Sequence, residues 1–188
     1  HYVLARMLEH PELPVDTVLN EYYRAFGPAA EAVAAYFRHW ESVSDSLTDD
    51  LLARNPEGKF DYVNSFGTFY RAADSLFTSQ AMADGKAKLV RARAAAANDE
   101  MARARVSFLE VGLRHAEMTL AVEAARREGE RSGDVSRFVQ ALRELDQFRA
   151  AHETEGIANM FFLWNNETKG NKSGTWDRKL AASAPNGE

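Results

Sequence analysis

The chain has 188 residues, a formal net charge of −5 and no cysteine, so disulfides and thiolate metal sites are excluded. The negative charge lies in the first third. Residues 1–60 hold five Lys and Arg against ten Asp and Glu, whereas residues 61–188 hold eighteen of each. This balance argues against nucleic acid as a partner. No apolar run approaches the ~20 residues of a membrane span, so we expect none.

Two short helices are predicted at the start of the chain. Residues 2–9 are mostly apolar and have no cap before them, which is typical of the tail of a helix that begins upstream; Pro11 and Pro14 end it. A second helix is predicted over residues 15–26, with Asp16 in its first turn. Because the chain opens without an initiator methionine or a signal peptide, we interpret it as a fragment or a processed product.

A sharp corner is predicted at Gly27-Pro28. Gly27 suits the left-handed position after a helix, and Pro28 suits the first turn of the next one. Apolar residues then recur at steps of three and four over residues 32–47, which predicts a third helix ending before the turn signal at residues 55–58. Residues 62–77 keep the same spacing and predict a fourth helix, although Phe and Tyr are weak helix formers.

The dominant feature is a long central helix predicted over residues 87–128, which contain no proline. Its length would be roughly 60 Å. Asp84-Gly85 is predicted to separate it from the preceding helix. We expect a break at Asn98-Asp99, with one of these residues capping a second segment that starts near Met101. The apolar stripe that follows is formed by Val106, Leu109, Leu113, Ala116, Leu120 and Ala124.

A last helix is predicted after a break at residues 129–133, with Asp134 or Ser132 as its cap. It carries apolar residues from Val135 to Phe148, and an extension through Gly156 to about Trp164 stays open. The polar residues 165–188 are expected to be irregular. The prediction is therefore an all-α helical bundle of about six or seven helices over residues 1–164, with one long central helix and a polar C-terminal tail at 165–188.

One pair of side chains resembles part of a metal site. His152 and Glu155 stand three residues apart, with Glu153 beside them, so one helix face could offer an imidazole and a carboxylate. Two ligands do not make a site, and no second Glu/His pair at ligand spacing occurs in the sequence. A solvated or locally hydrogen-bonded His is the alternative that we prefer. We predict no metal and no cofactor.

No catalytic residue is predicted. His115 lies beside the central apolar stripe and is interpreted as a histidine at the core edge, with a hydrogen bond, in preference to a catalytic one. Asp49-Asp50 could resemble a glycosidase carboxylate pair, but adjacent residues at a helix end do not span a cleft, which favours a solvated face. Nucleophile elbows, Walker loops and dinucleotide fingerprints are missing, since Gly67, Gly85 and Gly112 stand alone.

Aromatic residues give the only candidate ligand contacts. The chain has eleven Phe, six Tyr and three Trp, most of which must be in the core. Sugars stack on exposed Trp rings, so Trp164 and Trp176, flanked by polar residues, are the candidate ligand-binding residues for a carbohydrate or a partner. Packing of a C-terminal arm is the alternative. Asn166 and Asn171 match glycosylation sequons, which are frequent by chance.

A family resemblance supplies the functional expectation. Residues 2–37 contain Leu4-Ala5 and Leu8 before Pro11, Val15-Asp16, Leu19, Tyr22-Tyr23, Phe26-Gly27-Pro28-Ala29-Ala30 and Tyr36. Residues 103–116 add a weaker match at Arg103, Val106, Leu109, Gly112-Leu113 and His115-Ala116. Together these stretches resemble the helical region that follows the barrel in an uncharacterised bacterial family of glycoside-hydrolase-like proteins, domain of unknown function 4838.

The resemblance implies a helical domain C-terminal to a (β/α)₈ barrel in a polysaccharide-degrading bacterial protein that is exported to the periplasm or beyond. This chain lacks the alternating strands and helices of such a barrel, so no catalytic residue is carried over. The favoured hypothesis is an accessory domain whose partners are that barrel and, through it, carbohydrate. The rival hypothesis is a free-standing helical module for protein–protein interaction or dimerisation, with self-association through the long helix.

Overall fold

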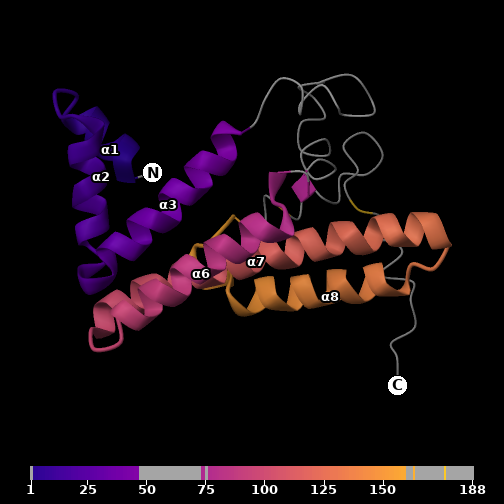
Figure 1. The fold of residues 1–188 in the computed structure, drawn as a ribbon. Helices are drawn as coiled ribbons and strands as arrows, with labels where there is room; N and C mark the ends of the chain where they lie inside the picture. The colour runs from indigo at the N-terminus through magenta and orange to yellow at the C-terminus, as the bar shows by residue number, and fades with distance from the viewer. Residues whose placement is uncertain (1, 47–72, 75, 160–162, 164–175, 177–188) are drawn as a thin grey trace. The chain divides into compact units, whose positions relative to one another are not determined.

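The computed structural model describes residues 2–46, 73–74, 76–159, 163 and 176. Within these residues it contains six α-helices and no strand (Figure 1). The helices are α1 (Tyr2–Glu9), α2 (Val15–Arg24), α3 (Ala30–Asp45), α6 (Ser79–Ala95), α7 (Glu100–Ser132) and α8 (Ser136–Ala151). The predicted all-α fold with one long helix is confirmed. Most of the helix predicted over 62–77, and the tail at 165–188 apart from Trp176, lie outside the described residues.

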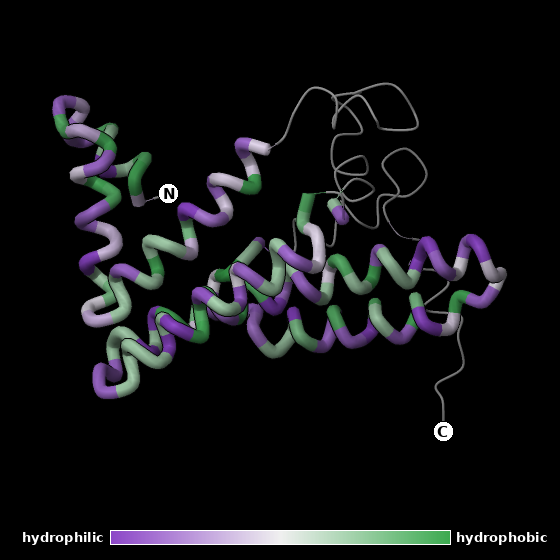
Figure 2. The backbone as a smooth tube through the Cα atoms, in the orientation of Figure 1, coloured by the Kyte–Doolittle hydropathy of each residue, from purple (hydrophilic) through white to green (hydrophobic). Residues whose placement is uncertain are grey.

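The chain forms two compact units. Unit 1 contains residues 1–44 and 80–110, and unit 2 contains residues 45–79 and 111–188. Helix α7 is one continuous helix of 33 residues, so its first part belongs to unit 1 and its longer second part to unit 2. Figure 2 shows hydrophobic residues spaced at intervals along α7 and α8, as expected for helices that each bury only one face.

The corner between α2 and α3 has the predicted geometry. Gly27 has φ 54° and begins the short 3₁₀ helix η1 (Gly27–Ala29), in which Pro28 occupies the first turn directly before α3. A Cβ at Gly27 would lie 3.0 Å from the Oδ2 atom of Asp99. Glycine is therefore required here both by the backbone conformation and by the close approach of Asp99.

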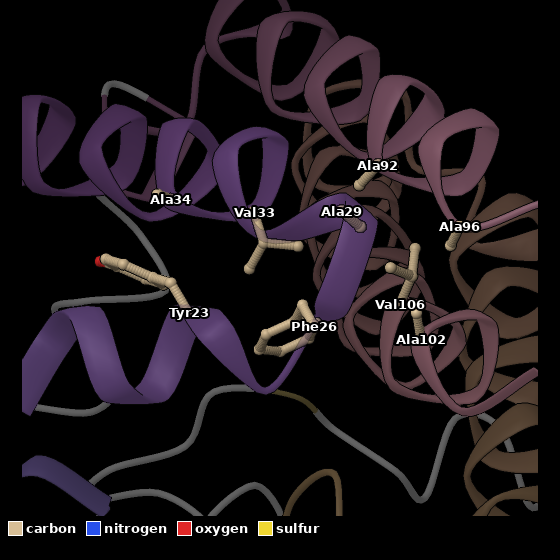
Figure 3. Packing of buried hydrophobic residues seen from close by; sticks show 9 residues of the cluster. All are labelled: Tyr23, Phe26, Ala29, Val33, Ala34, Ala92, Ala96, Ala102 and Val106. Atoms are coloured by element: carbon tan, nitrogen blue, oxygen red, sulfur yellow. The ribbon is translucent and has the colours of Figure 1, made fainter. Parts of the chain in front are cut away.

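Small residues dominate the core of unit 1, which fills the angle between α2 and α3 and continues onto α6 and α7 (Figure 3). Five of its nine buried residues are alanines. The nine are Tyr23, Phe26, Ala29, Val33, Ala34, Ala92, Ala96, Ala102 and Val106. Alanines let helix backbones approach closely, and a cluster of rings fills the wider space beside them, with Tyr22 in edge contact with Phe26 and Phe37.

The predicted break at Asp84-Gly85 is wrong, because α6 runs through both residues. Gly85 is buried against the indole of Trp40, and a Cβ at this position would lie 2.6 Å from the Cζ2 atom of that ring. The glycine therefore serves close packing between α3 and α6, for which a helix tolerates the loss of propensity. A break signal and a close-packing signal look the same in the sequence.

The second predicted break is confirmed, since α6 ends at Ala95 and α7 starts at Glu100. Asp99 precedes α7, and its Oδ1 atom accepts a hydrogen bond from the backbone N–H of Ala102 at 2.9 Å. This is the N-cap bond predicted for Asn98 or Asp99, and it satisfies one of the unpaired N–H groups of the first turn.

Unit 2 contains a hairpin of α7 and α8, and its connection is shorter than predicted. Helix α7 runs through Gly129 to Ser132, so only the end of the expected break at 129–133 is non-helical, where Gly133 has φ 80°. The predicted cap at Asp134 or Ser132 is wrong, because the N-cap of α8 is Val135, which makes no side-chain capping bond. The carboxylate of Asp134 instead accepts the backbone N–H of Ser136 at 2.9 Å, in the turn before the helix. This hydrogen bond holds the pKa of Asp134 below its usual value.

Helix α8 ends at Ala151, so its possible extension to Trp164 does not occur. A 3₁₀ turn, η3 (Glu153–Glu155), follows, and Gly156 then adopts a left-handed conformation with φ 69°. The helix buries large apolar side chains against the second half of α7. The buried members of this cluster are Val122, Phe138, Val139, Leu142, Leu145 and Trp176.

Candidate functional site

The strongest concentration of buried polar chemistry in the described residues lies in unit 2. Glu123 on α7 is 2 % exposed and Arg149 on α8 is 5 % exposed. A buried charge costs several kcal/mol unless hydrogen bonds and opposite charges compensate it. These two residues therefore mark the first places to look for a function beyond packing.

Glu123 is compensated by donors from three residues. Arg126 donates from Nε to Oε2 at 2.9 Å and from Nη2 to Oε1 at 2.7 Å, which is the bidentate arrangement that arginine makes with carboxylates. Arg127 donates from Nε to Oε1 at 3.2 Å, and the indole N–H of Trp176 donates to Oε2 at 3.3 Å. The hydrogen bonds that Arg126 donates to Glu123 raise the pKa of Arg126 above its usual value.

The two arginines extend this network to the surface. Arg126 also pairs with Glu130, and Arg127 pairs with Asp74, a residue far away in the sequence. Because Arg126 and Arg127 follow Glu123 by three and four residues, they lie on the same face of α7 and reach back to it. Each charge in the network has a partner of opposite sign, which is the pattern of a structural ion-pair cluster.

Arg149 meets a histidine that the sequence singled out. Its Nε atom donates a hydrogen bond of 3.0 Å to the Nε2 atom of His115, so this nitrogen acts as the acceptor. The His115 ring lies 6.5 Å from the ring of Phe148. The interpretation of His115 as a hydrogen-bonded histidine at the core edge is confirmed.

The predicted His152 and Glu155 pair is a local contact. The Nδ1 atom of His152 lies 2.7 Å from the Oε1 atom of Glu155, and the imidazole packs on Phe148 with ring centroids 4.5 Å apart. The local hydrogen bond was the preferred alternative to a metal ligand. Within the described parts of the chain, no three His, Asp or Glu side chains are grouped so that they could hold a metal ion.

Of the two candidate tryptophans, the structure describes Trp176. Trp164 lies outside the described residues, as do Asp49, Asp50 and the two sequon asparagines. Trp176 is 3 % exposed and packs in the apolar cluster of α7 and α8. This position corresponds to the packing alternative that the sequence left open beside a carbohydrate contact.

Sequence reasoning missed Glu123 and Arg149. A signal for Glu123 was present in the run Glu123-x-x-Arg126-Arg127, whose spacing is that of same-face ion pairs, but another donor to the carboxylate, the indole of Trp176, comes 53 residues later. A signal for Arg149 was its position on the apolar face of α8, seven residues after Leu142. Both sites use their polar groups to satisfy each other, and neither brings a nucleophile next to a general base.

Comparison with protein-family models, curated proteins and solved structures finds no match for this chain. Among the helices that the structure describes, none has the length and apolar character needed to cross a membrane. The resemblance to the glycoside-hydrolase-like family therefore stays a prediction, and the geometry of the two units carries the functional argument that follows.

Proposed function

We propose that this chain is a non-catalytic accessory domain of a bacterial carbohydrate-degrading protein, and that it packs through α1 against a (β/α)₈ barrel of that protein. The observation that carries the proposal is the arrangement of α1. This helix has no buried residue, and its most apolar side chains point into solvent, with Leu4 62 % exposed and Leu8 76 % exposed.

Three exposed apolar residues of α1 lie on one side of the helix. Leu4 and Leu8 are four residues apart, so they lie one above the other, beside the exposed Ala5. The opposite side contacts α2, where the Nε atom of Arg6 and the hydroxyl of Tyr2 each donate to Glu21 at 3.2 Å and the Tyr2 ring lies 5.7 Å from the Tyr22 ring. A surface helix normally turns its leucines inward, so a helix held this way supports an apolar neighbour.

The residues behind the family resemblance support an accessory role because they shape the fold. Gly27 adopts the left-handed conformation of the corner, Pro28 starts the next helix and Ala29 is fully buried behind it. These three corner residues carry no group that could do acid–base or nucleophilic chemistry. The motif thus favours a shared helical architecture, and catalysis is assigned to the barrel.

Hydrolysis of aryl glycosides by the purified chain tests the first half of the proposal. We expect no turnover. Turnover that a point substitution in this chain abolishes would overturn the assignment of catalysis to a separate barrel. The flanking coding sequence tests the second half, since a reading frame with alternating strands and helices before residue 1 is expected.

The role of α1 is tested in the longer protein by replacing both leucines with lysine. Leu4→Lys with Leu8→Lys is expected to lower the melting temperature of the barrel. The matched control, Val90→Lys, changes another exposed apolar residue, on α6, and is expected to leave that melting temperature unchanged. Equal effects of the two variants would contradict docking through α1.

A free-standing interaction module is the second candidate, and a different observation favours it. Met101 and Phe108 on α7 are both exposed and are seven residues apart, which places them on one face two turns from each other. Self-association through this face predicts a concentration-dependent dimer in light scattering. Met101→Lys with Phe108→Lys would abolish that dimer, whereas Leu4→Lys with Leu8→Lys would not.

A further inference from the structure

Among the described residues of the unit 2 cluster, Trp176 is the large apolar side chain that comes from neither α7 nor α8. The other buried members of this cluster are Val122 on α7 and four residues of α8, and Met118, Ala125 and Ala141 pack against the cluster. The four are Phe138, Val139, Leu142 and Leu145. Among the described residues, the indole therefore shares its cluster with side chains of a single helical hairpin, α7 and α8.

The carboxylate of Glu123, which accepts the indole N–H, is also held by bonds that do not involve Trp176. Arg126 donates a hydrogen bond to each oxygen of Glu123, and Arg127 donates a third. All three residues lie on α7. The orientation of the carboxylate is therefore set by α7 alone. Oxygen Oε2, which receives the indole N–H, stays aimed at the cluster by its bond to Arg126. A preorganised acceptor in a nearly dry site favours a donor ligand, because little ordering remains to be done on binding.

We propose that the α7–α8 hairpin is a preformed indole-binding site, that Trp176 of the same chain occupies it as an intramolecular ligand, and that the site accepts a free indole when that side chain is removed. The ligand class is a flat bicyclic aromatic ring with one N–H donor. The apolar walls select the ring, since dry cavities lined by Leu, Val and Phe bind small aromatic molecules. The carboxylate of Glu123 selects the N–H.

The test uses the Trp176→Ala variant and the probes indole and 1-methylindole, which has nearly the same shape but no N–H. Circular dichroism first establishes that the variant is folded. Calorimetric titration is expected to give saturable binding of one indole per chain, at least tenfold tighter than 1-methylindole. The unsubstituted protein, whose site is filled, is expected to bind indole at least tenfold more weakly than the variant.

Trp40→Ala is the matched control. It also removes an indole that packs inside a unit, there against Gly85, and it leaves the cluster around Trp176 and Glu123 filled. We expect no preference of this variant for indole over 1-methylindole. A folded Trp176→Ala variant that binds neither probe, or binds both equally, would overturn the proposal.

Loss of folding in Trp176→Ala still leaves a decisive measurement. Indole added during refolding is then expected to restore a cooperative thermal transition, because a ligand that binds only the native state stabilises it. The same concentration of 1-methylindole is expected to restore less. No rescue by indole, or equal rescue by both compounds, would overturn the proposal.

Discussion

The two units pack their helices with different kinds of side chain. Unit 1 brings helices together over alanines and one glycine, and fills the wider angle between α2 and α3 with rings. Unit 2 contains no alanine among its fully buried cluster and packs Leu, Val, Phe and Trp side chains around a compensated carboxylate. Small residues set the distance between backbones in the first case, and large side chains fill it in the second.

This difference predicts opposite sensitivities. In unit 1 the damaging changes are those that add atoms, because closely spaced backbones leave no volume for them. In unit 2 the damaging changes are those that remove atoms, because each large side chain leaves a cavity. The following variants test the comparison, beginning with the largest expected effect.

Leu142→Ala is expected to have the largest effect. The side chain of Leu142 is fully buried in unit 2, and such a truncation lowers the free energy of unfolding by about 2–5 kcal/mol. Urea denaturation measures the change. Leu8→Ala on the exposed face of α1 is the control and is expected to change it by less than about 0.5 kcal/mol. Similar values for the two variants would contradict the assignment of the core.

Glycine-to-alanine substitutions in the two units are expected to have opposite signs. In unit 1, Gly85→Ala places a Cβ 2.6 Å from the ring of Trp40 and should lower stability by about 1–3 kcal/mol. In unit 2, the nearest atom to a Cβ at Gly112 is Cγ2 of Ile157 at 3.5 Å, which is an ordinary contact. Gly112→Ala should therefore raise stability by up to about 1 kcal/mol through helix propensity. Melting temperatures that move in the same direction would refute the contrast.

Gly27→Ala is expected to lower stability by about 1 kcal/mol, because φ is positive and Asp99 crowds the new Cβ. Gly133→Ala shares the positive φ but meets no atom within 4 Å. The difference between the two melting temperatures isolates the contact with Asp99. A Gly27→Ala variant as stable as the unsubstituted protein would count against the corner.

The smallest expected effect is the loss of stability at acidic pH through Glu21. The hydrogen bond from Arg6 lowers the pKa of Glu21 below its usual 4.5, so the folded state binds this proton less readily than the unfolded state. The stabilisation is present above about pH 4.5 and is lost as the pH falls through the folded pKa. Glu21→Gln should therefore flatten the pH dependence of the melting temperature between pH 5 and about 3. An unchanged profile would show that this pair contributes nothing.

The helices and the corner could be predicted because their causes are local. The spacing of apolar residues, the Gly27-Pro28 pair and the cap at Asp99 each act within a few residues of their own position. The same reasoning failed at Gly85, because its reason is an indole 45 positions earlier in the sequence. A glycine in a helix carries no mark of whether it breaks the chain or admits a neighbour.

The polar sites also divide into those with local causes and those with long-range causes. The contact of His152 with Glu155 is local, and its sequence spacing was sufficient to find it. The burial of Glu123 could not be found, because its carboxylate lies beside a cluster that includes Trp176, from far along the chain. Long-range closure of this kind decides which charged residues become buried, and spacing within one helix does not encode it.

The contacts of α1 with Glu21 affect how fast the amide hydrogens of this helix exchange. Eight residues are too few for a helix to persist alone in water, so α1 is expected to lose its helical hydrogen bonds whenever its contacts with Glu21 open. Amide hydrogens of residues 6–9 should then exchange by a local opening, orders of magnitude faster than those of the buried helices. Molar salt should hasten this exchange by screening the contact between Arg6 and Glu21. Amide hydrogens around Leu142 should exchange only as slowly as global unfolding allows. A single exchange experiment would therefore distinguish α1 from the buried helix α8 by rate.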